Sequence, residues 1–500
     1  MHPLTFKGPL AGRYPAVAAM VLLALIPFLA LSAALQPLTP IISAQLHMSA
    51  QAFSLSSGLG NAAYALGTVL AVQFAQHLPQ RRMLLAYAVV LVIGSVLTAS
   101  AQDAGMYFTG HILQGIATSM LLIAAVPPLA IGFPQDKLRT TAVIMNMCIF
   151  GAVALGPFIG GVQAGSDSWR PLFWIVAGIS ALALLFAVLT FDDAPPVNPD
   201  SPRDLPAIAL AAIGCVAAFV GAAELTSHRF LSVGVLAPLL GGLAVIVALI
   251  VYQFRASEPL LQVRSMLTSS IPIAGIIVAL FAAAASVSVT VLTAATLSER
   301  YSAVHVGLLF LPELAGAVIS AIAFGAVITR RELHYLPLAG MFLLAVGIVL
   351  FRIEVPASQP LALVGSAVTG LGLGATVAPA LFVAGFSLPA ASLQRVFAIV
   401  ELLRAVAAFM IAPIFVHFAA GASGGLDAGT GNALWVGLGI AIVGAGLGVA
   451  VYALSGARPQ APDIEGFLEG PDSAWPSPPL LAKLRPKAVV ESPPVLESVG

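Results

Sequence analysis

Long apolar runs alternate with short polar interruptions along almost the whole chain. Each run has about 20 residues or more, which is the length that an α-helix needs to cross a bilayer. This pattern predicts an all-α polytopic membrane protein with fourteen transmembrane helices. The predicted spans are 16–39, 52–76, 82–100, 105–131, 138–163, 171–191, 205–225, 231–253, 271–296, 303–328, 335–352, 360–384, 393–420 and 431–455.

The composition agrees with a membrane protein and argues against an enzyme. Hydrophobic residues make up 59% of the chain and charged residues only 8%, and the mean hydropathy is +1.02. A soluble domain of this length could not cover its core with so few charges. Cys148 and Cys215 both fall within apolar runs, where they give no disulfide or metal signal. The sequence has no phosphate-binding loop or metal-ligand cluster, so we expect no cofactor, no metal and no nucleic-acid partner.

The basic residues fall mainly on alternate loops, which fixes an orientation. Cytoplasmic loops carry the excess of Lys and Arg. With a cytoplasmic N-terminus, the inside set is Lys7, Arg13, Arg81, Arg82, Lys137, Arg139, Arg203, Arg255, Arg264, Arg330, Arg331, Arg395, Arg458, Lys483, Arg485 and Lys487. The outside set is Arg170, Arg229, Arg300 and Arg352. We therefore expect a multi-pass protein of the plasma (inner) membrane with both termini in the cytoplasm.

Two Pro-rich stretches divide the chain. Residues 192–204 separate the sixth and seventh spans, and the chain becomes Pro-rich with mixed charge from Gly456. The second stretch buries too little apolar surface to offset its ordering entropy, so we expect a disordered cytoplasmic tail. The predicted domains are a cytoplasmic N-terminus (1–15), an N-terminal six-helix bundle (16–191), an inserted helix pair (205–253), a C-terminal six-helix bundle (271–455) and the tail (456–500).

One motif stands out in the fifth predicted span. Residues 151–161 read Gly-Ala-Val-Ala-Leu-Gly-Pro-Phe-Ile-Gly-Gly. Gly156 and Gly160 share a helix face, and Pro157 removes a backbone donor and bends the helix. Ordinary close packing of helices would by itself explain these glycines. The full pattern, which includes Gly151 and Gly161, is similar to the fifth-helix antiporter motif of the major facilitator superfamily.

Other segments agree with this resemblance in order and position. Residues 111–115, His-Ile-Leu-Gln-Gly, resemble the superfamily's Arg-x-x-Gln-Gly motif with His in place of Arg. Residues 169–173 resemble a segment that follows the antiporter motif in drug exporters, and residues 301–312 resemble the start of helix 10 in the fourteen-helix drug:proton antiporter branch. Arg404 lies where that branch usually carries Arg. The resemblance covers about residues 16–455 and implies the major facilitator fold, with two six-helix bundles plus two inserted helices.

The loop after the second span departs from the family pattern, Gly-x-x-x-Asp-Arg-x-Gly-x-Arg-Arg. Arg81 and Arg82 keep the final pair, but Gln76 stands at the position of the Asp. That Asp normally helps to latch the cytoplasmic gate, so we expect Gln76 to keep a hydrogen bond without the charge. The acid that is common in helix 1 of these exporters is also missing. Proton coupling must therefore use other groups.

Ionisable residues within the predicted spans are the candidates, because each costs about 2.5–3.5 kcal/mol at mid-helix. His111 can change its charge near neutral pH, or it can be a hydrogen-bonded core residue. Glu313 is suited to bind protons or a cationic substrate, or it can cap the backbone disturbed by Pro312. Glu401 and Arg404 are three apart, which favours a static ion pair over a switching one. The neutral polar residues that could join them in a cavity are Gln114, Asn61, Tyr64, Gln73 and Asn146.

These observations together predict a secondary active transporter. We expect it to export a small amphiphilic or aromatic compound by alternating access, in exchange for protons. Its partners would be the small-molecule substrate, protons and the lipid bilayer, with a periplasmic adaptor protein as a further option. Two alternatives stay open: a proton-coupled importer or facilitator, and a non-transporting membrane sensor or scaffold that acts through its tail.

Overall fold

The computed structural model describes residues 8–191, 195–196, 198–469, 472–480 and 482–484. Within these residues, fourteen helices are long and apolar enough to cross a membrane. This confirms the predicted number of spans and the all-helical class. The largest differences in length are at the first span, which continues past Pro40 to Gln45, and at the last, which already begins at Gly425.

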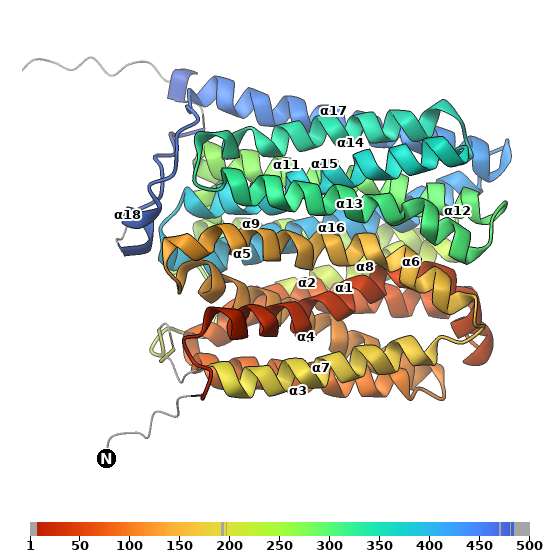
Figure 1. The fold of residues 1–500 in the computed structure, drawn as a ribbon, viewed down its shortest axis with the longest axis horizontal. Helices are drawn as coiled ribbons and strands as arrows, with labels where there is room; N and C mark the ends of the chain where they lie inside the picture. Colours follow the sequence, from red (N-terminus) through yellow and green to blue (C-terminus); the bar gives the residue numbers. More distant parts are fainter. Residues whose placement is uncertain (1–7, 192–194, 197, 470–471, 481, 485–500) are drawn as a thin grey trace, which may run out of the picture.

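The first six spans form the N-terminal half, the lower part of the molecule in Figure 1. The fifth span is interrupted by a π-helical turn, Met147–Gly151, that joins α5 to α6. The helices of this half are α1 (Tyr14–Gln45), α2 (Ala50–His77), α3 (Gln80–Ala99), α4 (Ala104–Ile131), α5 (Leu138–Asn146), α6 (Ala152–Ala164) and α7 (Arg170–Thr190).

The last six spans form the C-terminal half, and the inserted pair lies between the halves in sequence. In the ninth span a second π-helical turn, Ser288–Thr293, joins α11 to α12. The inserted pair is α8 (Leu205–Ala223) and α9 (Val233–Arg255). The C-terminal half consists of α11 (Ser270–Val287), α12 (Ala294–Ser298), α13 (Ala303–Val327), α14 (Leu336–Ile353), α15 (Gln359–Phe386), α16 (Leu393–Ala420) and α17 (Gly425–Ser455). Short helices α10 (Val263–Thr268) and α18 (Ile464–Glu469) lie outside the spans.

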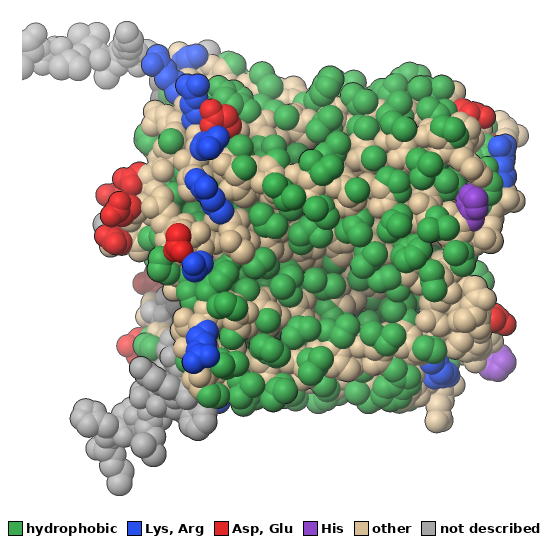
Figure 2. Space-filling model, viewed as in Figure 1, with side chains coloured by type: hydrophobic (Ala, Val, Ile, Leu, Met, Phe, Trp, Pro, Cys, Tyr) green, Lys and Arg blue, Asp and Glu red, His purple; other side chains and the backbone are tan. Residues whose placement is uncertain are grey.

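The charged side chains lie at the two ends of the helices. Figure 2 shows hydrophobic side chains over the middle of the surface and most Lys and Arg side chains at one end, here called the basic end. The helix order places there Arg13, Arg81, Arg82, Lys137, Arg139, Arg203, Arg255, Arg264, Arg330, Arg331, Arg395, Arg458 and Lys483. Arg170, Arg229, Arg300 and Arg352 lie at the opposite end.

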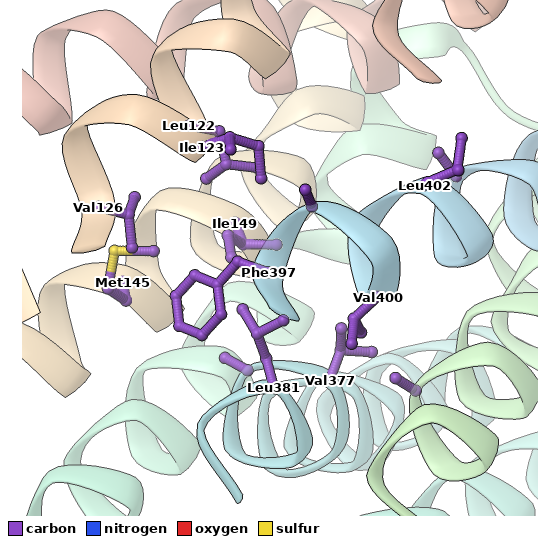
Figure 3. Packing of buried hydrophobic residues seen from close by; sticks show 14 of the residues in the cluster. Leu122, Ile123, Val126, Met145, Ile149, Val377, Leu381, Phe397, Val400 and Leu402 are labelled. Carbon is purple, nitrogen blue, oxygen red and sulfur yellow. The ribbon is translucent and has the colours of Figure 1, made fainter. Parts of the chain in front are cut away.

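The basic end is closed between the halves by an apolar plug. Figure 3 shows side chains from α4, α5 and the first π-helical turn meeting side chains from α15 and α16. All of them are at most 5% exposed, so water is excluded here. The plug consists of Leu122, Ile123, Val126, Met145, Ile149, Val377, Leu381, Phe397, Val400 and Leu402.

Part of the chain after Gly456 packs against the basic end of the C-terminal half. The described residues of the segment 463–480, here called the C-terminal strap, include α18. The ring of Phe467 lies edge-on to Phe386 at the end of α15, with centroids 5.1 Å apart. Trp475 lies 4.4 Å from the ring of His334. Both aromatic side chains of the strap are buried.

Backbone hydrogen bonds fix the strap in place. The Ala474 amide donates to the Phe386 carbonyl (2.8 Å), and the Ser270 amide donates to the Pro478 carbonyl (3.0 Å). The prediction of a disordered tail is therefore wrong for the strap, because a few apolar residues among the prolines find buried positions. Residues 485–500 lie outside the described part of the chain.

Candidate functional site: a cavity between the halves

A cavity of about 280 Å³ lies between the two halves. It is bounded by the plug on the side of the basic end and extends to the exposed Gln36 near the opposite end. Both halves contribute four spans each. The cavity is lined by Phe28, Leu29, Ser32, Ala33, Leu35, Gln36, Ser57, Asn61, His111, Ile149, Phe150, Val153, Pro157, Ala283, Ser286, Val287, Thr290, Val291, Glu313, Leu373, Arg404, Ala408, Phe409 and Ala412.

Both π-helical turns contribute to the lining. Ile149 and Phe150 belong to the first turn, and Thr290 and Val291 belong to the second. Such turns re-aim side chains within a helix and occur often at functional sites. The sequence analysis missed them, since no local residue pattern distinguishes a π-helical turn from ordinary helix.

A buried ion pair on α16 is joined to the N-terminal half. The Arg404 Nε donates to Glu401 Oε2 (2.8 Å), and a second Arg404 nitrogen donates to Oε1. The Tyr64 hydroxyl on α2 also donates to Oε1 (2.7 Å). A second polar link between the halves runs from Asn146 Nδ2 to the Gly374 carbonyl (2.8 Å). The carboxylate of Glu401 thus accepts hydrogen bonds from residues of both halves, Tyr64 and Arg404. Arg404 also borders the cavity.

Glu313 lies in the cavity wall on α13 and is 3% exposed. Among the described residues, its carboxyl group has neither a hydrogen-bond partner nor an ion-pair partner. Backbone capping beside Pro312 is therefore not seen. A Cβ atom at Gly370 would lie 2.8 Å from the Cα of Glu313, so this glycine lets α15 approach α13 at the acid.

His111 also borders the cavity and is 3% exposed. Its Nδ1 has no partner in the described part of the structure. The ring stacks on Tyr107 (6.0 Å) and lies 5.8 Å from Phe28. Gly60 makes room for it, because a Cβ atom there would lie 2.8 Å from Nε2. Gln114 does not face the cavity, contrary to expectation: its Nε2 donates to Ser95 Oγ (3.1 Å) on α3.

The glycines of the 151–161 motif contact different partners. Cβ atoms at Gly156 and Gly160 would overlap α1 of the same half, at Ala33 and Ala34 respectively. Gly161 instead lies against the Ala303 backbone of α13 in the other half. The additional volume at Gly151 would meet only the Met147 side chain of its own helix, and Pro157 borders the cavity. The motif therefore supports close packing within one half and across the interface.

The predicted gate residues lie at the basic end, where Gln76 contacts the linker before α8 and Arg81 contacts its own half. The Ser201 hydroxyl donates to Gln76 Oε1 (2.7 Å), so Gln76 binds the linker before α8. Arg81 donates to the Val188 carbonyl (3.3 Å) of its own half, and Arg82 is exposed. No ion pair between described residues joins the two halves. In this conformation the basic end is closed by apolar contacts.

The amino-acid sequence is similar to that of known membrane transporters. The sequence model of the Major Facilitator Superfamily matches residues 20–311. YubD of Bacillus subtilis, described as an uncharacterized MFS-type transporter, is 25% identical over 72% of this chain and 71% of YubD. JefA of Mycobacterium tuberculosis, described as a drug efflux pump, is 24% identical over 60% of this chain and 60% of JefA.

Solved structures share the fold. The human organic anion transporter MFSD10 superposes with a TM-score of 0.61 at 14% identity, over 87% of this chain and 99% of MFSD10. The proton:xylose symporter XylE gives a TM-score of 0.59 at 13% identity, over 86% of this chain and 94% of XylE. The family match covers more than half of the chain and agrees with the fourteen spans and the cavity between two halves. The protein is a multi-pass membrane transporter of the Major Facilitator Superfamily.

Proposed function

We propose that the protein exports a small amphiphilic or aromatic compound, preferentially a cationic one, in exchange for protons. The single observation that carries this proposal is the position of Glu313. Its carboxyl group has no partner among the described residues and borders a cavity lined largely by apolar side chains. The relative JefA, which is named as a drug efflux pump, supports the direction of transport.

Exchange can follow from the presence of one carboxyl group, that of Glu313, for two competing cations, the proton and the substrate. A carboxylate at this depth is costly unless a positive charge compensates it. Either a proton or a substrate cation can neutralise the carboxylate of Glu313, and once one of them is bound no negative charge is left to attract the other. Binding of one therefore weakens binding of the other, which is the coupling that antiport requires. The rings of Phe28, Phe150 and Phe409 provide apolar and aromatic surface for the rest of the substrate.

The orientation completes the proposal. With the basic end in the cytoplasm of a plasma (inner) membrane, the plug closes the cytoplasmic side and the cavity faces outward. This is the conformation in which a substrate leaves and a proton binds. The rocking motion that opens the cytoplasmic side must separate the plug and break the hydrogen bond between Tyr64 and Glu401. A periplasmic adaptor gains no support from the named relatives, and the proposal does without one.

His111 is the second group that we assign to the cavity's proton chemistry. It borders the same cavity as Glu313, and its Nδ1 has no partner in the described structure.

We assign a static role to the ion pair between Glu401 and Arg404, because each side chain compensates the charge of the other and forms hydrogen bonds with it. The alternative of a scaffold that binds partners through its tail gains no support, because the aromatic residues of the strap pack against the protein's own helices.

The test uses energised everted membrane vesicles with a pH-sensitive dye inside. Lipophilic cations, neutral aromatic compounds and aromatic acids are added in turn. An exporter moves its substrate into the vesicle and protons out, so the dye reports a rise in internal pH. We expect this response for cations in the wild type and its loss in Glu313→Gln. The matched control is Glu332→Gln, which changes an exposed acid at the basic end. A response to aromatic acids alone, or one unchanged in Glu313→Gln, would contradict the proposal.

A further inference from the structure

A second cavity lies beside the first at the end opposite to the basic end. It has a volume of about 670 Å³ and lies between the last turns of α16 and the hairpin that joins α8 to α9. This hairpin, residues 224–232, is here called the outer hairpin. The side chain of Ala412 borders both cavities. The two spaces are therefore neighbours across the seam between α2 and α16.

The inserted pair is bound firmly to α2 near the outer hairpin. Gln51 Nε2 donates to Glu224 Oε2 (3.0 Å), and the Ser54 hydroxyl donates to the Ala223 carbonyl (3.3 Å). One turn further along α2, a Cβ atom at Gly58 would lie 3.2 Å from the Phe219 carbonyl. The backbone of α8 is thus in direct contact with the N-terminal half.

The same attachment is repeated at the basic end of α2. The Asp204 amide donates to Gln73 Oε1 (2.9 Å), and His77 Nε2 is hydrogen-bonded to the Ser201 carbonyl (2.8 Å). The Ser201 hydroxyl donates to Gln76 as well. Gln76 and His77 thus both bind the linker before α8. The inserted pair is fixed to α2 at both ends of the membrane span.

The attachment of the inserted pair to the C-terminal half is smaller than its attachment to α2, and it lies at the outer hairpin. Among the described residues, one hydrogen bond joins them, from His417 Nδ1 to the Leu225 carbonyl (3.0 Å). One ring contact accompanies it, between Phe230 and Phe418 with centroids 5.1 Å apart. When the two halves rotate relative to each other, the boundary with fewer contacts gives way first. The boundary between the outer hairpin and α16 is therefore the surface that must slide.

We propose that the inserted pair moves with the N-terminal half and that the outer hairpin gates a side passage between α2 and α16. The second cavity is the outer part of this passage and a transient site for the amphiphilic substrate on its way out. This assignment rests on the proposed export. The chemistry of the walls fits an amphiphile: Ala412, Pro413 and Val416 are apolar, whereas Ser54 and Thr226 are polar.

The test compares two pairs of cysteines in a background with Cys148→Ala and Cys215→Ala. The gate pair is Phe230→Cys with Phe418→Cys, across the boundary that should slide. The control pair is Gln51→Cys with Glu224→Cys, within the body that should move as one. Each pair is joined in everted vesicles by a short reagent that a reductant can cleave.

We expect the joined gate pair to lose substrate-driven proton movement by about tenfold or more, with recovery after reduction. The joined control pair should stay within about twofold of the unjoined protein. Full activity of the joined gate pair would overturn the proposal. Equal inhibition of both pairs would also overturn it, because the inserted pair would then not move with the N-terminal half.

A second readout needs no substrate. Ser54→Cys, which borders the second cavity but not the first, is labelled from the water on the outer side with a charged maleimide, alone and together with the joined gate pair. We expect the joined pair to slow labelling about tenfold or more, and the joined control pair to leave it unchanged. Equal labelling rates would overturn the gate. If no compound drives proton movement, the proposed export fails, whereas this labelling still decides whether the outer hairpin closes a passage.

Discussion

The Tyr64 hydroxyl donates a 2.7 Å hydrogen bond to Glu401 and joins α2 of one half to α16 of the other. Both residues are buried, and Glu401 also holds Arg404. Hydrogen bonds to charged groups contribute about 1.5–3 kcal/mol. This bond exists only while the halves are close at this level, so it stabilises the conformation with a closed basic end, which we propose to be outward-facing, relative to the inward-facing one.

Tyr64→Phe should therefore shift the protein toward the inward-facing conformation by roughly tenfold or more, since 1.4 kcal/mol corresponds to a factor of ten. The measurement is the labelling rate of Ser57→Cys, in the cavity wall, from the outer side. The rate should fall in the variant. Tyr87→Phe is the matched control, because the buried Tyr87 hydroxyl has no partner in the described structure. Equal effects of the two substitutions would contradict the assignment.

The ion pair between Glu401 and Arg404 should behave as a structural unit. Glu401→Leu leaves a buried Arg404 charge without compensation and should lower stability by about 3–5 kcal/mol. The double variant with Arg404→Leu removes both charges and should recover most of this loss. The measurement is thermal unfolding of the purified protein in detergent for both single variants and the double variant. Additive losses in the double variant would show that the charges do not act on each other.

Two glycines of the same motif should fail in different ways. Gly156→Ala places a methyl group against α1 within the N-terminal half and should lower stability by about 1–3 kcal/mol. Gly161→Ala places it against Ala303 in the other half, which can move away. This second variant should change the labelling rate of Ser57→Cys with little loss of stability. Identical behaviour of the two variants, by unfolding and by labelling, would refute this division.

The strap should detach in acid. Burial lowers the pKa of His334 to about 4 from its ordinary value of 6.5, and its Nδ1 is hydrogen-bonded to Tyr452 Oη (3.0 Å). A lowered pKa means that docking is fully favourable above pH 6.5 and weakens as the pH falls toward about 4, by roughly 3 kcal/mol at most. Limited proteolysis of residues 463–480 should accelerate over this range in the wild type. His334→Gln should remove the pH dependence, whereas a change at the exposed His228 should leave it intact.

The sequence predicts the spans well because each span is a local property. An apolar run of sufficient length is a spanning helix whatever its neighbours are, and the 151–161 motif indicated the family before any contact was known. The pair formed by Glu401 and Arg404 is equally local, since three residues of helix bring the side chains together.

The rest of the site depends on contacts between distant segments. Nothing near Tyr64 in sequence indicates that it meets Glu401, and nothing near Gln114 indicates that it turns away from the cavity. The gate was predicted from the charges at Arg81 and Arg82, but this conformation is closed by apolar residues from four spans. The strap was missed because its composition resembles disorder, while its few aromatic residues are stabilised only by the helices beneath them.

The proposed exchange depends on competition between a proton and a cationic substrate for Glu313. Its most direct test is the release of protons when substrate binds to the purified protein in weakly buffered detergent solution, followed across the pH range in which carboxyl groups and histidine titrate. We expect proton release in the wild type and in Glu332→Gln, and none in Glu313→Gln. Binding of the cation without proton release, or equal release in Glu313→Gln, would contradict it.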